Sequence, residues 1–282
     1  MQKTTNKVAL EKVFEHAQAV DKYCTEHGGT RIFTALFGSQ NYGLDDEHSD
    51  VDTKSLIIPE LTDWLWSTEG NTNIVITMPD GSHAELKPVV SMFKQFLKGN
   101  INFLEVLYTP YVDVAPGWEW LYEELIFNAD YITEHNKYSQ ASVWFGYLDQ
   151  MIRRTQHSSM TAEVDPITHC DTMGYNYELG YNPKALMNAV RLKETIIRYF
   201  EFKRPFAEAI DMTDMREYIL PIKRSTLTYN HVVDILDDLD SWMGKMRTWI
   251  HDHYENKKTF NAEFYLRHLA LEIFIRMDGV SQ

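Results

Sequence analysis

The sequence predicts an α+β protein in which a part with strands and helices precedes an all-helical part. Short β-favouring runs separated by turn residues occupy the chain up to Pro110. From Trp118 onward, apolar residues recur at helical spacing and prolines punctuate the pattern. We place the boundary between Val112 and Gly117, which gives an N-terminal domain of residues 1–115 and a helical domain of residues 116–282.

Composition excludes several classes of protein. The chain has 282 residues, of which 44% are hydrophobic and 24% charged, as in an ordinary globular protein with a sizeable core. Its formal net charge of -14 argues against a nucleic-acid-binding surface that extends over the whole molecule. Cys24 and Cys170 are far apart in the sequence, which excludes a disulfide scaffold and a CxxC metal or redox motif.

We expect a cytoplasmic protein without a membrane partner. Residues 1–12 are polar and lack the apolar core of a signal peptide. The sequence contains no run that approaches the roughly 18 apolar residues needed for a membrane-spanning helix.

The first predicted element is an amphipathic helix from Val8 to Glu26, which Gly28 and Gly29 end. Its apolar positions are Leu10, Val13, Phe14, Ala17, Val20 and Tyr23.

Two strands follow this helix. Ile32 to Phe37 is a β-favouring run stopped by Gly38, and Val51 to Ile58 is a second run ended by Pro59. The polar segment from Asp45 to Asp50 is the turn region between them.

A hairpin and a helix complete the N-terminal domain. The β-like runs Ile74 to Met78 and Ala84 to Val89 flank Pro79-Asp80-Gly81, which is a strong turn signal. A helix from about Val90 to Lys98 follows and ends at Gly99-Asn100.

The turn after the first strand has the composition of an anion-binding loop. The absent side chain of Gly38 leaves room for a phosphate close to the backbone. Backbone N–H groups and the hydroxyl of Ser39 would face the anion. Gly38 and Ser39 are therefore candidate nucleotide-binding residues.

Two acids lie at the start of the second strand. Asp50 and Asp52 are two residues apart, and within a strand this spacing puts both carboxylates on one face. Paired carboxylates are ligands that Mg²⁺ accepts, usually together with substrate phosphates. We expect Asp50 and Asp52 to bind metal.

Glu85 supplies a third acid. His83 and Glu85 alternate with Ala84 and Leu86, so the polar pair shares one face of its strand. If this strand lies beside the second strand, Glu85 completes a three-carboxylate cluster, whose mutual repulsion a cation would relieve. Asp80 competes for this role, but its place in a Pro-Asp-Gly turn explains it as a structural residue.

This combination resembles the motif set of the DNA polymerase β-like nucleotidyltransferase superfamily. That set is Gly-Ser, a spacer, Ser-Asp-x-Asp and a later acid on a strand. The longer pattern is closer to one branch, the predicted nucleotidyltransferases called RlaP-like. The resemblance covers residues 31–110 well and the helical remainder more loosely. The residues that carry it are Phe37 to Leu44, Ser49 to Asp52, Phe93 to Gly99, and Asn102 to Tyr108 with Pro110.

The resemblance implies a fold and a set of roles. The fold would be a polymerase β-like palm, a small mixed sheet with helices, followed by an all-helical domain. Gly38 and Ser39 would hold the triphosphate, while Asp50 and Asp52 would bind two Mg²⁺ ions, which Mn²⁺ could replace. Glu85 would bind the metal nearer the attacking hydroxyl and help to deprotonate that hydroxyl.

Three further residues allow a structural or a functional interpretation. Ser49 either fixes its loop through its hydroxyl or contacts the nucleotide. His83 is either an ordinary strand residue or part of the site. For Glu105, within Leu-Glu-Val-Leu-Tyr, we favour a role in bracing the first domain.

A predicted helix from Asn182 to Phe202 carries a narrow polar stripe. The stripe consists of Lys184, Asn188, Arg191, Thr195 and Arg198. A solvated face explains the pattern, yet its only charges are positive in an acidic protein. RlaP-like proteins show a similar Lys…His…Arg helix, with Asn188 at the His position here. Lys184 and Arg191 are therefore candidates that would face the phosphates or the acceptor.

We predict a nucleotidyltransferase that moves an NMP from an NTP such as ATP, with Mg²⁺, to a hydroxyl or phosphate acceptor. The acceptor is a small molecule, an RNA end or a protein hydroxyl, and no motif selects among them. One alternative is an AMPylator-like enzyme that modifies protein Tyr, Ser or Thr. The other is a non-catalytic module that binds a nucleotide or a partner. Three intact carboxylates count against this module, because a retired site has no reason to keep their repulsion.

Overall fold

The structure is a computed structural model in which the chain forms two compact units. Unit 1 comprises residues 1–41, 45–136 and 258–282, and unit 2 comprises residues 42–44 and 137–257. The residues that the structure describes are 7–46, 49–60, 74–158, 164–172, 174–224, 227–257 and 261–280.

A five-stranded mixed sheet forms the centre of unit 1, with the strand order β3-β4-β2-β1-β5. β1 (Thr30–Phe37) pairs antiparallel with β2 (Asp52–Ile58) and with β5 (Val112–Val114). β4 (His83–Pro88) runs parallel to β2 and antiparallel to β3 (Ile74–Thr77). The strand that carries Glu85 therefore lies beside the strand that begins at Asp52.

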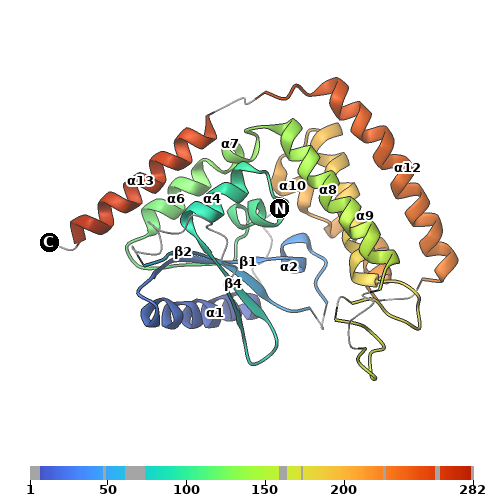
Figure 1. The fold of residues 1–282 in the computed structure, drawn as a ribbon, viewed down its shortest axis with the longest axis horizontal. Helices are drawn as coiled ribbons and strands as arrows, with labels where there is room; N and C mark the ends of the chain where they lie inside the picture. The colour runs from blue at the N-terminus through green and yellow to red at the C-terminus, as the bar shows by residue number, and fades with distance from the viewer. Residues whose placement is uncertain are drawn as a thin grey trace. The chain divides into compact units, whose positions relative to one another are not determined.

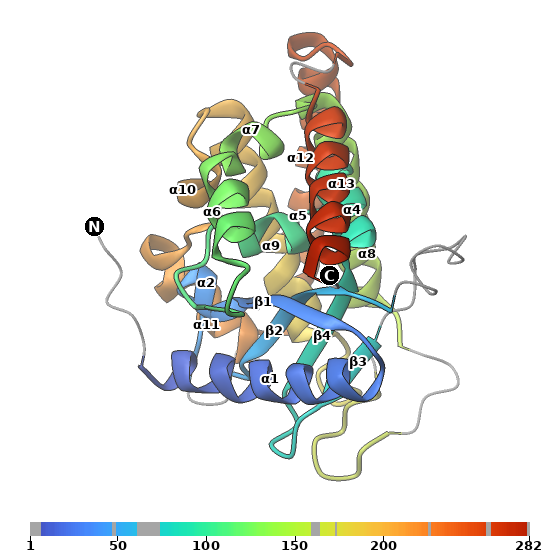
Figure 2. The same cartoon turned by 90° about the vertical axis from the view of Figure 1, so that its left-hand side faces the viewer.

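Helices cover both faces of this sheet (Figures 1 and 2). α1 (Lys7–Glu26) lies along one face, whereas α4 (Val89–Leu97), α6 (Glu119–Phe127) and α13 (Ala262–Val280) lie on the opposite side. The remaining helical elements of the unit are α5 (Ile101–Leu104), the 3₁₀ turn Glu105–Leu107 and α7 (Ala129–Thr133). The predicted α+β class is confirmed.

The central position of β1 explains its sequence. Arg31 to Leu36 are all buried, because helices cover the strand on both sides. A strand that is buried on both faces has a continuous apolar run in place of alternating polar and apolar residues. The run from Ile32 to Phe37 is of this continuous kind.

The buried face of α1 differs in part from the predicted apolar stripe. Its buried residues are Ala9, Val13, His16, Ala17, Val20 and Cys24. Leu10 and Phe14 are instead 40% and 53% exposed. The helical period places these two side chains at the border of the face that the buried residues form. A histidine, His16, takes a core position that the apolar pattern did not include.

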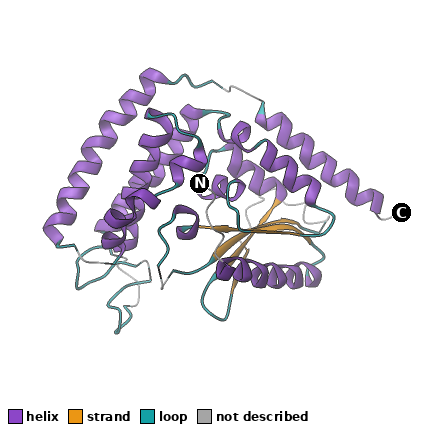
Figure 3. Cartoon of the chain, turned by 180° about the vertical axis from the view of Figure 1, so that it is seen from behind, coloured by secondary structure: helices purple, strands orange, loops and turns teal. Residues whose placement is uncertain are grey.

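Unit 2 is built from helices (Figure 3). α8 (Lys137–Gln156) packs against α9 (Pro183–Ile196), and α12 (Tyr229–His253) packs against both. α9 continues directly into a π-helical turn, Ile197–Glu201. The other helical elements are α10 (Phe206–Ile210), the 3₁₀ turn Thr213–Met215 and α11 (Arg216–Lys223). An aromatic core of Trp144, Tyr199, Phe200 and Phe206 joins α8, the π-helical turn and α10.

A short segment from the N-terminal part of the chain also belongs to unit 2. It is Tyr42–Leu44, which starts at the last residue of α2 (Ser39–Tyr42). The carbonyl of Tyr42 accepts a hydrogen bond from the N–H of Met212 (2.8 Å), and the carbonyl of Gly43 accepts one from Nη1 of Arg216 (2.5 Å). These bonds fasten the segment to Met212, just before the 3₁₀ turn Thr213–Met215, and to the first residue of α11.

The two units divide the chain differently from the predicted boundary at residue 115. α6, α7 and α13 follow that boundary in sequence, yet they belong to the unit that contains the sheet. Within the described part of the chain, the helices are too short or too polar to cross a membrane.

Gly43 gives a test of how tightly the segment Tyr42–Leu44 is held. Its backbone is left-handed (φ +72), and an added Cβ would overlap the side chain of Thr213. Gly43→Ala should therefore lower the free energy of unfolding by about 1–3 kcal/mol, measured by urea denaturation. Adding Thr213→Ala should recover only the steric part of this loss. Gly81→Ala is the control, because Gly81 is also left-handed (φ +87) but has open space around it. Equal losses at Gly43 and Gly81 would contradict the packing described here.

Candidate functional site

The turn after β1 has the open backbone that the sequence predicts. Gly38 adopts a φ of +94, and no atom lies within 4 Å of the position that a Cβ would occupy. Ser39 is half-buried and begins α2. The N–H of Gly38, however, already donates to Oε2 of Glu105 (3.1 Å). The space beside Gly38 is therefore open, while its own donor is bonded within the protein.

Glu105 braces this turn through hydrogen bonds to Gly38 and Asn41, as its sequence context suggests. Its side chain is fully buried, and its Oε2 also accepts from Nδ2 of Asn41 (3.5 Å). The same Nδ2 donates to the carbonyl of Leu36 (3.0 Å), and Thr109 donates to Oδ1 of Asn41 (2.7 Å). The bracing role of Glu105 is confirmed.

Asp52 is the first residue of β2 and lies opposite Phe37 in the β1–β2 register. Its Oδ1 accepts a hydrogen bond from the backbone N–H of His83 (2.9 Å), and the imidazole Nδ1 of His83 lies 3.5 Å from the same atom. Asp50 precedes the strand and is exposed. The strand alternation that put both acids on one face therefore applies to Asp52 alone.

Ser49 fixes its loop through its hydroxyl. The hydroxyl accepts from the N–H of Asp46 (2.8 Å) and donates to Oδ1 of the same residue (2.9 Å). This is the loop-fixing role proposed for it from sequence, and it sets the conformation of the chain just before Asp50.

Glu85 lies opposite Lys54 and not opposite Asp52. It forms ion pairs with Lys54, through a short hydrogen bond, and with Lys87 (Nζ–Oε1 3.4 Å). The ammonium of Lys54 also lies over the ring of Phe37, 3.7 Å from its centroid. Burial alone would raise the pKa of Glu85, but the two lysines outweigh it and lower the pKa below its ordinary value of 4.5. The carboxylate is thus anionic and already neutralised.

The donors present fit a metal ion only in part. Among the described residues, no three His, Cys, Asp or Glu side chains come together as a metal-binding group. The three-carboxylate cluster of Asp50, Asp52 and Glu85 is therefore not formed, because two lysines engage Glu85. Asp50 and Asp52 still fit Mg²⁺, which usually binds through one or two carboxylates plus substrate phosphates.

Asp80 has the structural role expected of a turn residue. Its Oδ1 accepts from the N–H of Ser82 (3.1 Å) and from the hydroxyl of Ser82 (2.5 Å). Its Oδ2 pairs with the ammonium of Lys12 (2.9 Å). The hydroxyl of Ser82 and the charge of Lys12 hold the pKa of Asp80 well below its usual range.

The polar stripe of α9 is not a solvated face, which corrects that interpretation. Lys184 is exposed and Asn188 half-buried, but Arg191, Thr195 and Arg198 are buried. The reason is that α8, α11 and α12 pack around α9 within unit 2, so most of its circumference is covered.

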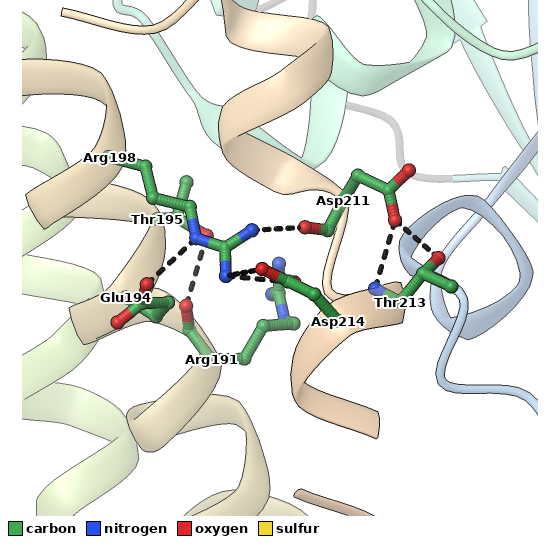
Figure 4. Close-up of polar contacts among 7 residues, drawn as sticks. All are labelled: Arg191, Glu194, Thr195, Arg198, Asp211, Thr213 and Asp214. Carbon is green, nitrogen blue, oxygen red and sulfur yellow. Dashed lines mark hydrogen bonds and ion pairs between the residues drawn. The ribbon is translucent and has the colours of Figure 1, made fainter. Parts of the chain in front are cut away.

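Two buried arginines on this stripe have opposite surroundings. Arg198 is fully engaged, with Glu194 (2.8 Å), the carbonyl of Asp211 (2.6 Å) and both carboxylate oxygens of Asp214 (2.9 and 3.0 Å), as Figure 4 shows. Arg191 is 1% exposed, and its Nε and Nη1 have no hydrogen-bond partner in the described part of the chain. Its guanidinium carbon lies 3.9 Å from the centroid of the Tyr42 ring.

Three residues near Asp52 escaped prediction from the sequence. Lys54 and Lys87 lie two residues after Asp52 and Glu85, so strand alternation alone could have placed them beside the acids. His16 lies between the core positions Val13 and Ala17 of α1, a spacing that marks it as buried.

No protein-family model matches the chain, and a search of curated proteins likewise gives no match.

The pairing of Glu85 with two lysines predicts a large loss of stability for Glu85→Gln. The change removes the carboxylate with which both buried lysines pair, which should cost about 3–5 kcal/mol in urea denaturation. Because the folded-state pKa of Glu85 is lowered, its ion pairs contribute fully above about pH 4.5, and this contribution is lost as the pH falls through the folded-state pKa. When the pH is lowered below 4.5, the free energy of unfolding should therefore fall less in the variant than in the wild type. Glu123→Gln, at an exposed site in the same unit, should change neither quantity.

Proposed function

We propose that the chain is a nucleotidyltransferase that uses Mg²⁺ to move an NMP from an NTP to a hydroxyl or phosphate acceptor. The observation that carries this proposal is the β1–β2 register. Because Phe37 lies opposite Asp52, the turn at Gly38-Ser39 and the acids at the start of β2 lie at the same edge of the sheet. A phosphate-binding turn beside metal-binding carboxylates is the arrangement that phosphoryl chemistry on an NTP needs.

The residues at this edge are suited to distinct tasks in the proposed reaction. The open space beside Gly38 admits a phosphate group close to the backbone, and the hydroxyl of Ser39 is a donor for it. Asp52 is held by the N–H of His83, which leaves its second oxygen for a cation. Mg²⁺ bound by Asp50 and Asp52 would neutralise phosphate charge and favour ionisation of the acceptor hydroxyl. Glu85 is left outside this set, as a partner of Lys54 and Lys87.

Unit 2 offers independent support for an anionic ligand. A buried guanidinium without a counter-charge is costly, and the structure supplies a full set of partners for Arg198 but not for Arg191. A phosphate is a matching partner for a guanidinium. We therefore assign Arg191 to phosphate binding, with the exposed ammonium of Lys184, two helical turns before it on α9, as a second cation.

One observation favours a second candidate function, a nucleotide-binding module without catalysis. The third acid is neutralised by lysines, so only two carboxylates remain for metal. This module would bind an NTP with Mg²⁺ and transfer nothing.

Transfer of label from [α-³²P]NTP with Mg²⁺ tests the proposal directly. We expect label on an added acceptor, and none from [γ-³²P]NTP. Label on a protein acceptor would identify the AMPylator-like activity.

Asp52→Asn should reduce transfer at least about 100-fold. Its melting temperature should equal or exceed that of the wild type, because the repulsion among negative charges falls. Asp149→Asn, in an exposed pair with Arg153, is the control. Tight NTP binding without transfer would favour the binding module, and no NTP binding would contradict both functions.

Replacing each of the two buried arginines, Arg191 and Arg198, by Met should have opposite effects on stability. Arg191→Met removes an uncompensated buried charge, so unit 2 should be as stable as wild type or more stable without ligand. The affinity for Mg²⁺·NTP, measured by calorimetry, should nevertheless fall at least about tenfold, as for a lost charged hydrogen bond. Arg198→Met should instead lower the stability by about 2 kcal/mol, because it removes bonds to charged partners. If Arg191→Met destabilises the fold as much as Arg198→Met does, Arg191 is a structural residue.

A further inference from the structure

His16 on α1 is a fully buried histidine whose two ring nitrogens both have partners. Its Nδ1 lies 2.9 Å from the hydroxyl of Thr53 on β2, and its Nε2 lies 2.9 Å from the hydroxyl of Ser82, just before β4. One side chain of the helix therefore spans the beginnings of two parallel strands.

The hydrogen-bond donors around His16 fix one arrangement of protons. Asp80 is ionised and can only accept, so the proton of the Ser82 hydroxyl goes to Oδ1 of Asp80 (2.5 Å). Nε2 of His16 must then carry a proton and donate to Ser82. Burial lowers the pKa of His16, which keeps the ring neutral, so Nδ1 has no proton and accepts from Thr53.

Each partner of His16 is the chain neighbour of a residue at the candidate site. Thr53 follows Asp52, and Ser82 precedes His83, whose N–H donates to Asp52. Side chains alternate along a strand, so Thr53 points to α1 while Asp52 points to the opposite face. His16 thus fastens the two strands on one face, and the bond between His83 and Asp52 joins them at the same level on the other.

We propose that His16 is a positioning residue that holds the starts of β2 and β4 together, so that the N–H of His83 orients the carboxylate of Asp52 toward a cation. The part of this inference that concerns the cation rests on the proposed function. The part that concerns the His83–Asp52 bond does not.

Hydrogen exchange of the His83 amide measures that bond directly. Thr53→Val removes one partner of His16 and keeps the backbone. Ser82→Ala removes the other partner together with its hydrogen bond to Asp80, and His16→Gln keeps a donor toward Ser82 only. Each should speed exchange at His83 about 5- to 10-fold, as for one lost buried hydrogen bond. Amides at the far end of β2 should change less. His27→Gln, at an exposed position just after the same helix, should leave His83 unchanged.

The imidazole itself provides a second readout. In the ¹⁵N spectrum of the wild type, Nε2 of His16 should be protonated and Nδ1 should not. The opposite tautomer, or unchanged exchange at His83 in folded Thr53→Val and His16→Gln proteins, would overturn the proposal and make His16 an ordinary core residue. Because Thr53→Val removes a single hydroxyl that bonds to His16, it keeps the test decisive if His16→Gln does not fold.

Cation binding separates this inference from the proposed function. Titration with Mn²⁺, followed by paramagnetic broadening of the amides near Asp52, should show weaker binding in Thr53→Val than in His27→Gln. If the wild type does not bind Mn²⁺ at Asp50 and Asp52, the proposed function fails, and the exchange result at His83 still decides the positioning role. If Mn²⁺ binds equally to both variants while His83 exchange rises, His16 holds the strands but does not tune the cation site, and the proposal is wrong in that part.

Discussion

The parallel pairing of β2 with β4 decides what each polar side chain at this edge of the sheet meets. The register places Glu85 beside Lys54, which follows Asp52 by two residues on the same face of β2. A shift by one residue would turn Ala84 and Leu86 to that face and bury the charges under α1. Apolar packing of Ala84 and Leu86 against α1 opposes such a shift, since both are fully buried there. The hydrophobic core on one face of the sheet thus determines the arrangement of charges on the other.

Buried charge in this acidic protein is mostly positive near the candidate residues. Lys54 and Lys87 are both buried and both pair with the carboxylate of Glu85. In unit 2, Arg191 is buried with an aromatic ring beneath it and two unpartnered nitrogens. Local fields of this sign attract anions even when the whole molecule has a net charge of -14. A negatively charged ligand is therefore compatible with both units.

The sequence predicts what is local and leaves open what depends on pairing. The strands other than β5, and the turns, followed from short β-favouring runs, from Gly38 and from the Pro-Asp-Gly turn, because these signals act over a few residues. β5 lies in the segment that the sequence pattern assigns to the domain boundary. The bracing by Glu105 followed from its apolar surroundings. The partners of Glu85 did not, because a strand's own sequence does not reveal the register of its neighbour. The core position of His16 does not follow from the apolar pattern of its helix, because hydrogen bonds to the hydroxyls of Thr53 and Ser82 are what make a polar residue acceptable there.

During synthesis, the residues of unit 2 are complete before those of unit 1. Unit 2 is almost continuous, and its only distant piece, Tyr42–Leu44, is synthesised well before the rest. Unit 1 lacks α13 (Ala262–Val280) until after all of unit 2 has been synthesised. Co-translational folding normally proceeds from the N-terminus. Here the sheet must wait, with one side incompletely covered, while the helical unit can already close around its early segment.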